Sequence, residues 1–272
     1  MNGAGLEPIA LGSVLTTAVR RHSLLAYFVI AFALCWGAIL LGLVERFHFW
    51  APMLGAFAPA VAALVVSGLS EGEPAVRALL RRLGEWRVSP WWYGVVFGLP
   101  LAEGVLALGV ATLLGKTIPP SVDRLEQLRA VGPALWVAYV FAACEEVGWR
   151  GFALPRLLAS HPPLVASLIL GAVHAVWHWP LVLLPGQLLS DVPVAPYSLF
   201  VVAEAVVFTW IFQNTGGSLL MVTLFHGSSN VAGVLYNGID PGWMPRLKPS
   251  IAVLVAVLVV LVTGPGLVRR RD

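Results

Sequence analysis

The sequence predicts an all-α fold, a polytopic bundle of about eight transmembrane helices, and three observations predict it. Hydrophobic residues make up 58% of the 272 residues and charged residues only 11%, whereas about a quarter of the residues in a soluble domain are charged. Apolar stretches of the roughly 20 residues that a helix needs to cross a bilayer recur along the chain. Basic residues gather at the ends of these stretches, as they do in membrane proteins, so the net charge of +3 does not indicate a nucleic-acid partner.

Eight stretches are read as membrane spans from their length and hydropathy. The first two are joined by a brief turn around Arg46, and the sixth and eighth are short. The expected spans are residues 24–44, 51–69, 91–115, 132–154, 164–184, 197–212, 218–236 and 251–262.

The distribution of arginine and lysine predicts the orientation of these spans. With a cytoplasmic amino terminus, 11 of the 17 basic residues fall on the inner side and six on the outer side. Both termini are then expected to be cytoplasmic. The first apolar stretch is too long for a cleaved signal peptide, so we expect it to remain as a membrane anchor.

The connection between the second and third spans, residues 71–92, predicts a helix at the membrane surface. Apolar residues recur there at helical spacing, with arginines on the other face, which is typical of an interfacial helix. No linker long enough to separate domains interrupts the chain. We therefore expect a single membrane domain over residues 1–272, with its motifs within about 132–236.

The fourth span carries charges that require an explanation, because a charge at the centre of a membrane helix costs roughly 2.5–3.5 kcal/mol on insertion scales. Glu146 and Arg150 are four residues apart, so they share a helix face and can pair. Glu145 is rotated by about 100° from Glu146 and is free to point into a cavity. One carboxylate is thus predicted to be structural and the other to carry chemistry.

Two later spans bring histidine and asparagine to similar depths. The fifth span places His174 and His178 one turn apart, and the seventh does the same for His226 and Asn230. Each pair alone is explained by packing or by hydrogen bonds between helices. If the polar faces of all three spans converge, they predict a wet polar cavity inside the membrane.

A carboxylate, imidazoles and an amide in one cavity favour hydrolysis. Glu145, poorly hydrated there, can take a proton from water as a general base. A neighbouring histidine can orient that water or bind a metal ion, while a second histidine and an amide can stabilise the oxyanion of a tetrahedral intermediate. Arg150 would hold Glu146 ionised and in place.

These motifs resemble those of the CAAX protease and bacteriocin-processing (CPBP, or ABI) family of intramembrane proteases. That family has Glu-Glu-x-x-x-Arg on one helix, Phe-x-x-x-His on the next and His-x-x-x-Asn on a later one. Here "EEVGWR" supplies the first motif, "WHWP" supplies the histidine of the second, and "HGSSN" supplies the third. The resemblance spans about residues 141–232 and implies an intramembrane endopeptidase of the CAAX protease type.

The resemblance also implies roles for individual residues. The candidate catalytic residues are Glu145, Glu146, Arg150, His178, His226 and Asn230. Glu145 would activate water together with His178, and His226 and Asn230 would form the oxyanion site. His174 stands where the family has phenylalanine, as an additional ligand or as a polar substitution. No cofactor is certain; a zinc ion held by Glu145, His178 and His226 and a metal-free site both stay open.

Three other interpretations stay open from the sequence. Buried ionisable residues also mark ion pathways in transporters, and Glu103 and Glu204 in the third and sixth spans enlarge that set, although no internal repeat is evident. A non-catalytic membrane protein, such as one that binds a peptide and gives immunity to it, would need no turnover. A thiol mechanism through Cys144 would need a thiolate, which an apolar helix disfavours.

The expected partners are the lipid bilayer and a peptide or protein substrate, either membrane-bound or lipid-modified. The resemblance covers enzymes that trim prenylated carboxyl termini and enzymes that act on other peptides, and the sequence selects neither. The Arg-rich and Ala-rich chain carries no organellar address, which is compatible with a prokaryotic plasma membrane.

Overall fold

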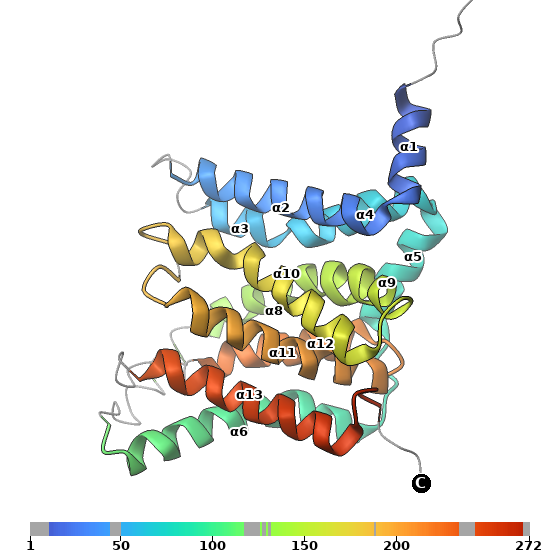
Figure 1. The fold of residues 1–272 in the computed structure, drawn as a ribbon. Helices are drawn as coiled ribbons and strands as arrows, with labels where there is room; N and C mark the ends of the chain where they lie inside the picture. The colour runs from blue at the N-terminus through green and yellow to red at the C-terminus, as the bar shows by residue number, and fades with distance from the viewer. Residues whose placement is uncertain are drawn as a thin grey trace, which may run out of the picture.

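The computed structural model describes residues 11–43, 50–116, 126, 129, 132–187, 189–233 and 243–268. In this part of the chain all regular structure is helical, as the composition predicts (Figure 1). The elements are α1 (Leu11–Arg21), α2 (Ser23–Leu41), α3 (Trp50–Ala56), α4 (Ala58–Ser70), α5 (Glu73–Arg81), η2 (Arg82–Gly84), α6 (Pro90–Leu113), α8 (Gly132–Glu146), η3 (Val147–Ala153), α9 (Leu154–Leu158), α10 (Pro163–Leu183), α11 (Val194–Asn214), α12 (Leu219–Ala232) and α13 (Met244–Thr263).

Each predicted span coincides with helical structure, and five of the described helices are long and apolar enough to cross a membrane: α2, α6, α10, α11 and α13. The second span is divided into α3 and α4 at Phe57, because Pro59 has no N–H with which to continue the preceding helix. The sixth and eighth spans are longer than predicted, since α11 and α13 include polar residues that read as flanking loops in the sequence. Residues 44 and 234–236 of the predicted spans lie outside the described part.

The helices lie side by side, with α2 and α4 along one edge of the bundle and α6 and α13 along the opposite edge (Figure 1). Helices α8, α10, α11 and α12 occupy the middle. Both α1 and the carboxyl-terminal end of the described chain lie at the same end of the bundle as α5. A chain with an even number of spans has both of its ends on the same side of the membrane, and this arrangement agrees with that. The cytoplasmic location of this end stays a prediction.

The expected interfacial helix is α5, and the short η2 turn attaches it to the bundle. Arg82 in η2 donates one hydrogen bond to the carbonyl of Gly217 at 3.0 Å and one to the carbonyl of Gly151 at 3.3 Å. Gly217 has φ +80°, which disfavours other residues, and a Cβ there would collide with the Arg82 guanidinium. The sequence "NTGG" before α12 therefore provides a docking point for α5.

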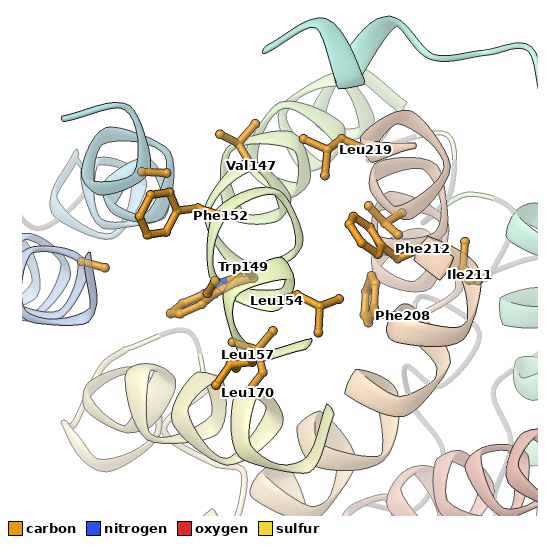
Figure 2. Close-up of a cluster of buried hydrophobic side chains, with 14 of the residues drawn as sticks. Val147, Trp149, Phe152, Leu154, Leu157, Leu170, Phe208, Ile211, Phe212 and Leu219 are labelled. Carbon is orange, nitrogen blue, oxygen red and sulfur yellow. The ribbon is translucent and has the colours of Figure 1, made fainter. Parts of the chain in front are cut away.

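A π-helical segment, η3, runs through the centre of the bundle directly after the paired glutamates. All seven of its residues are buried, and Figure 2 shows Val147, Trp149 and Phe152 pointing outward among side chains of the surrounding helices. The Trp149 ring lies 5.7 Å from that of Tyr27 on α2 and 5.6 Å from that of Trp177 on α10. Wider π-turns are rare and frequently occur at functional sites.

Glycine allows the closest helix contact of this segment. A Cβ on Gly148 would lie 2.5 Å from the Pro59 Cβ and 2.7 Å from the Pro59 carbonyl carbon, and backbone cannot move away as a flexible side chain can. Small residues are the usual means by which membrane helices approach closely. Gly148 therefore sets the distance between η3 and α4.

We predict that Gly148→Ala destabilises the fold by about 1–3 kcal/mol, because an extra methyl group overpacks a rigid contact. Thermal unfolding in detergent, followed with a fluorophore that reacts with the buried thiol of Cys35, measures the effect. Gly98→Ala is the matched control, since Gly98 is an exposed glycine in α6 with nothing within 4 Å of its Cβ position. Equal melting temperatures for the two variants would contradict this packing account.

Candidate active site

A cavity of about 510 Å³ lies between the helices that carry the predicted motifs. It is lined by residues of α2, α3, α8, α10, α11 and α12 and by Arg150 of η3. Six of the seven predicted site residues line it: Glu145, Arg150, His174, His178, His226 and Asn230. The polar faces of the fourth, fifth and seventh spans therefore converge on one space.

Glu146 lies beside this cavity at the centre of an ion-pair network. Its Oε1 accepts hydrogen bonds from Arg150 Nη1 at 2.9 Å and from His226 Nδ1 at 2.8 Å. The side chains of Glu146 and Arg150 are 0% and 1% exposed, so this is a buried pair, as the four-residue spacing predicts. The Arg150 guanidinium carbon also lies 3.9 Å from the centre of the Phe208 ring on α11, a favourable cation–π geometry. Glu146 thereby connects α8, η3 and α12.

Glu145 points to a different helix, α10. Its Oε2 lies 3.1 Å from His174 Nε2, and a carboxylate can only accept, so Nε2 carries the hydrogen. His178 Nδ1 lies 3.1 Å from the carbonyl oxygen of His174 and must likewise donate. Neutral His178 then presents an unprotonated Nε2, which can accept a hydrogen bond or bind a metal ion.

The three side chains of Glu145, His174 and His178 form the cluster of potential metal ligands within the described residues. One ligand atom of each lies within 4.8 Å of the others. This set differs from the expected one of Glu145, His178 and His226, because His226 turns its Nδ1 to Glu146 instead. The sequence marks His174 only as a departure from a motif, and its contact with Glu145 depends on the rotation of α10, which periodicity does not specify.

Asn230 lies one turn after His226 on α12 and lines the cavity with an exposed side chain. Tyr139 of α8 holds this part of α12 in position: its hydroxyl lies 3.1 Å from Ser228 Oγ, and its ring occupies the space that a side chain at Gly227 would need. Helices α8 and α12 therefore pack in close contact with each other beside the cavity.

Aromatic rings surround the two histidines of α10. The Trp149 ring lies 4.7 Å from that of His174, and the Tyr197 ring lies 5.6 Å from that of His178. These aromatic rings reduce the contact of the two histidines with water. Electrostatic interactions in such poorly hydrated surroundings are stronger than in bulk water. Cys144, the candidate thiol, is partly buried and is not among the residues that line the cavity.

Comparison with known proteins agrees with the motifs. Residues 127–232 match the family described as type II CAAX prenyl endopeptidase, Rce1-like, and this range includes every predicted site residue. A curated relative is a protein of Methanococcus maripaludis named CAAX prenyl protease 2. The two chains are 24% identical over 100 residues, which cover 35% of this chain and 37% of the relative. The match thus spans little more than a third of the relative's length.

We predict that Arg150→Ala destabilises the protein by about 3–5 kcal/mol, because it leaves the buried Glu146 carboxylate without its cation. Arg77→Ala is the matched control: Arg77 and Glu73 have the same spacing and lie 2.5 Å apart, but their side chains are 75% and 71% exposed. Such an exposed pair contributes only about 0.3–0.5 kcal/mol. Thermal unfolding in detergent compares the two variants.

The double variant Glu146→Leu with Arg150→Met provides a second test of the buried pair. Replacing both charges by apolar groups removes the unpaired carboxylate, so the double variant is expected to be more stable than Arg150→Ala. A double variant that unfolds at a lower temperature than Arg150→Ala would contradict this explanation.

Proposed function

We propose that the chain is a member of the CAAX protease family, which its central part matches, and that it is an intramembrane endopeptidase that hydrolyses a peptide bond in the cavity between α8, α10 and α12. One observation carries this proposal. Two adjacent carboxylates have separate surroundings: Glu146 is held by Arg150 and His226, and Glu145 faces the cavity beside two histidines. This separation supports one structural and one catalytic carboxylate.

We propose that Glu145 and His178 hold the attacking water. A water between them donates one hydrogen to the Glu145 carboxylate and one to His178 Nε2, which leaves a lone pair of its oxygen free for the carbonyl carbon. As the new C–O bond forms, Glu145 takes the proton. It then passes the proton to the amide nitrogen as the C–N bond breaks, so the amine leaves neutral and a carboxyl group remains.

We propose that His226 and Asn230 bind the oxyanion of the intermediate. The Asn230 side-chain amide is a donor that lines the cavity. His226 donates through Nδ1 to Glu146, so an oxyanion contact through Nε2 requires the imidazolium form, in which both ring nitrogens carry hydrogen. Preorganised donors of this kind are usually the largest single contribution to such catalysis.

Glu145, His174 and His178 also fit a zinc ion, because two imidazoles and one carboxylate are a ligand set of catalytic zinc sites. A zinc ion there would polarise a bound carbonyl or water. With zinc bound, Glu145, His174 and His178 would serve as its ligands, and the oxyanion contacts of α12 would remain the contribution of the protein's own residues.

The proposed substrate is a peptide segment of a protein at the membrane. The name of the archaeal relative describes a prenyl protease, which favours a lipid-modified or membrane-attached substrate. The cavity supports this class, since its lining combines apolar side chains of α2 and α3 with the polar residues of the motifs.

We predict that Glu145→Gln lowers kcat by about 10²–10⁴-fold, the usual contribution of a general base, while the melting temperature changes little. Cleavage of a peptide mixture by purified protein in liposomes, read by mass spectrometry, measures it. Cys144→Ala is the matched control at the neighbouring position and is expected to keep activity. Normal turnover by Glu145→Gln would refute the assignment, and substrate flux without cleavage would indicate a transporter.

We predict that His174→Phe, which restores the residue found at this position in the family, lowers kcat by about 10–100-fold. The Glu145 carboxylate loses a hydrogen bond, and hydrogen bonds to charged groups contribute roughly 1.5–3 kcal/mol. His161→Phe is the control, since His161 lies in the loop between α9 and α10, outside the cavity. Unchanged kcat for His174→Phe would show that His174 does not position Glu145.

A further inference from the structure

A second group of buried charges lies next to the candidate active site. Glu103 on α6 and Glu204 on α11 are 5% and 4% exposed. Lys248 on α13 interacts electrostatically with both, and its ammonium lies 4.1 Å from the centre of the Phe200 ring. Charges inside the membrane are costly and generally mark function, and the water-activating and oxyanion steps use none of these three residues.

Glu204 belongs to this group and also lines the catalytic cavity, together with Glu145 and Asn230. Its Oε2 accepts a long hydrogen bond of 3.5 Å from Ser229 Oγ, next to Asn230 in the chain. Its Oε1 is buried and has no hydrogen-bond partner among the described residues. A buried acceptor without a donor is costly, so the Glu204 carboxylate is suited to a ligand that brings hydrogen-bond donors into the cavity.

The charges around the cavity favour a cationic ligand. Of the described residues that line it, Glu145 and Glu204 carry carboxyl groups, and Arg150 is the one with a guanidinium or ammonium group. Arg150 and His226 are both directed to Glu146, so neither forms a hydrogen bond to Glu204 in the described part of the chain. Glu204 is the carboxylate with both an unpartnered oxygen and a place in the cavity wall.

We propose that Glu204 binds a lysine or arginine side chain of the peptide substrate close to the scissile bond and thereby determines which peptides are cut. This inference rests on the proposed protease function of the same cavity. An ammonium or guanidinium group supplies the hydrogen-bond donors that the second oxygen of Glu204 lacks, and its charge strengthens these bonds. Its aliphatic stem packs on the Phe200 and Phe208 rings, which also line the cavity. A neutral side chain there leaves a buried carboxylate unpaired, which is a strong basis for rejection.

The test uses peptides, blocked at both ends, in which each position flanking the scissile bond carries either lysine or uncharged norleucine. At one position, lysine is expected to raise kcat/KM over norleucine by about 10–100-fold, the range for a hydrogen bond to a charged group. In Glu204→Gln the ratio is expected to fall to about 1, whereas Glu73→Gln, an exposed change on α5, keeps it. Both peptides are cut by one preparation, so the ratio is independent of the folded fraction.

A Glu204→Gln variant with the wild-type ratio, or a wild-type protein without a preference at any position, would overturn the proposal. A lysine-free peptide with a free amino terminus is the third arm, and preferential cleavage of this peptide alone would assign the cation to the terminus and overturn the side-chain assignment.

Binding of the same fluorescently labelled peptides to wild-type protein separates this proposal from the protease function. If no peptide is cut, but the lysine peptide binds more tightly in a manner that depends on Glu204, the cation site stands and the protease function fails. If the two peptides bind equally well, the cation site is overturned.

Discussion

The buried carboxylate of Glu146 is the constraint on which the rest of this site depends. With no exposed surface, it is stable only with partners, and it takes Arg150 from η3 and His226 from α12. Removing one partner of such a buried pair lowers the stability of the fold far more than replacing both partners by apolar residues. The network therefore fixes the rotation of α8 relative to α12. Because Glu145 directly precedes Glu146 on the same helix, this rotation directs the Glu145 carboxylate toward α10. It also fixes which nitrogen of His226 remains for the cavity.

The three carboxylates in and beside the cavity have different proposed roles: one is structural, one is catalytic and one binds the substrate. Glu146 is held through its Oε1 by Arg150 and His226. Glu145 faces His174 on α10, and Glu204 lines the same cavity and has one oxygen without a partner among the described residues. The proposed catalytic residues all lie within the part of the chain that matches the family, residues 127–232. The charges that accompany Glu204 come from α6 and α13, outside that part. In the proposed function, the residues of the family match carry out catalysis and Glu204 selects the substrate. Helices α6 and α13 then supply the charged residues next to Glu204.

Much of this architecture follows from the sequence because it depends on local spacing. Hydropathy predicted helical structure at each of the eight stretches, five of which contain a described helix of membrane-spanning length, and the four-residue spacing predicted the pair of Glu146 and Arg150. The π-helical segment η3 was not predictable, since a π-turn is stabilised by packing around it rather than by its own residues. The preference of Glu145 for His174 over His226 depends on how α10 is rotated in the bundle. Helix α1 and the polar first turns of α13 were missed because their polar residues read as loops.

The most direct measurement is a cryo-electron microscopy structure of Glu145→Gln with an uncleaved peptide substrate. The account predicts that the scissile carbonyl carbon lies beside the side chain at position 145 and His178, with the carbonyl oxygen turned to His226 and Asn230. A peptide bound outside the cavity, or one whose carbonyl oxygen turns away from α12, would contradict the central claim that these three helices together form a hydrolytic site.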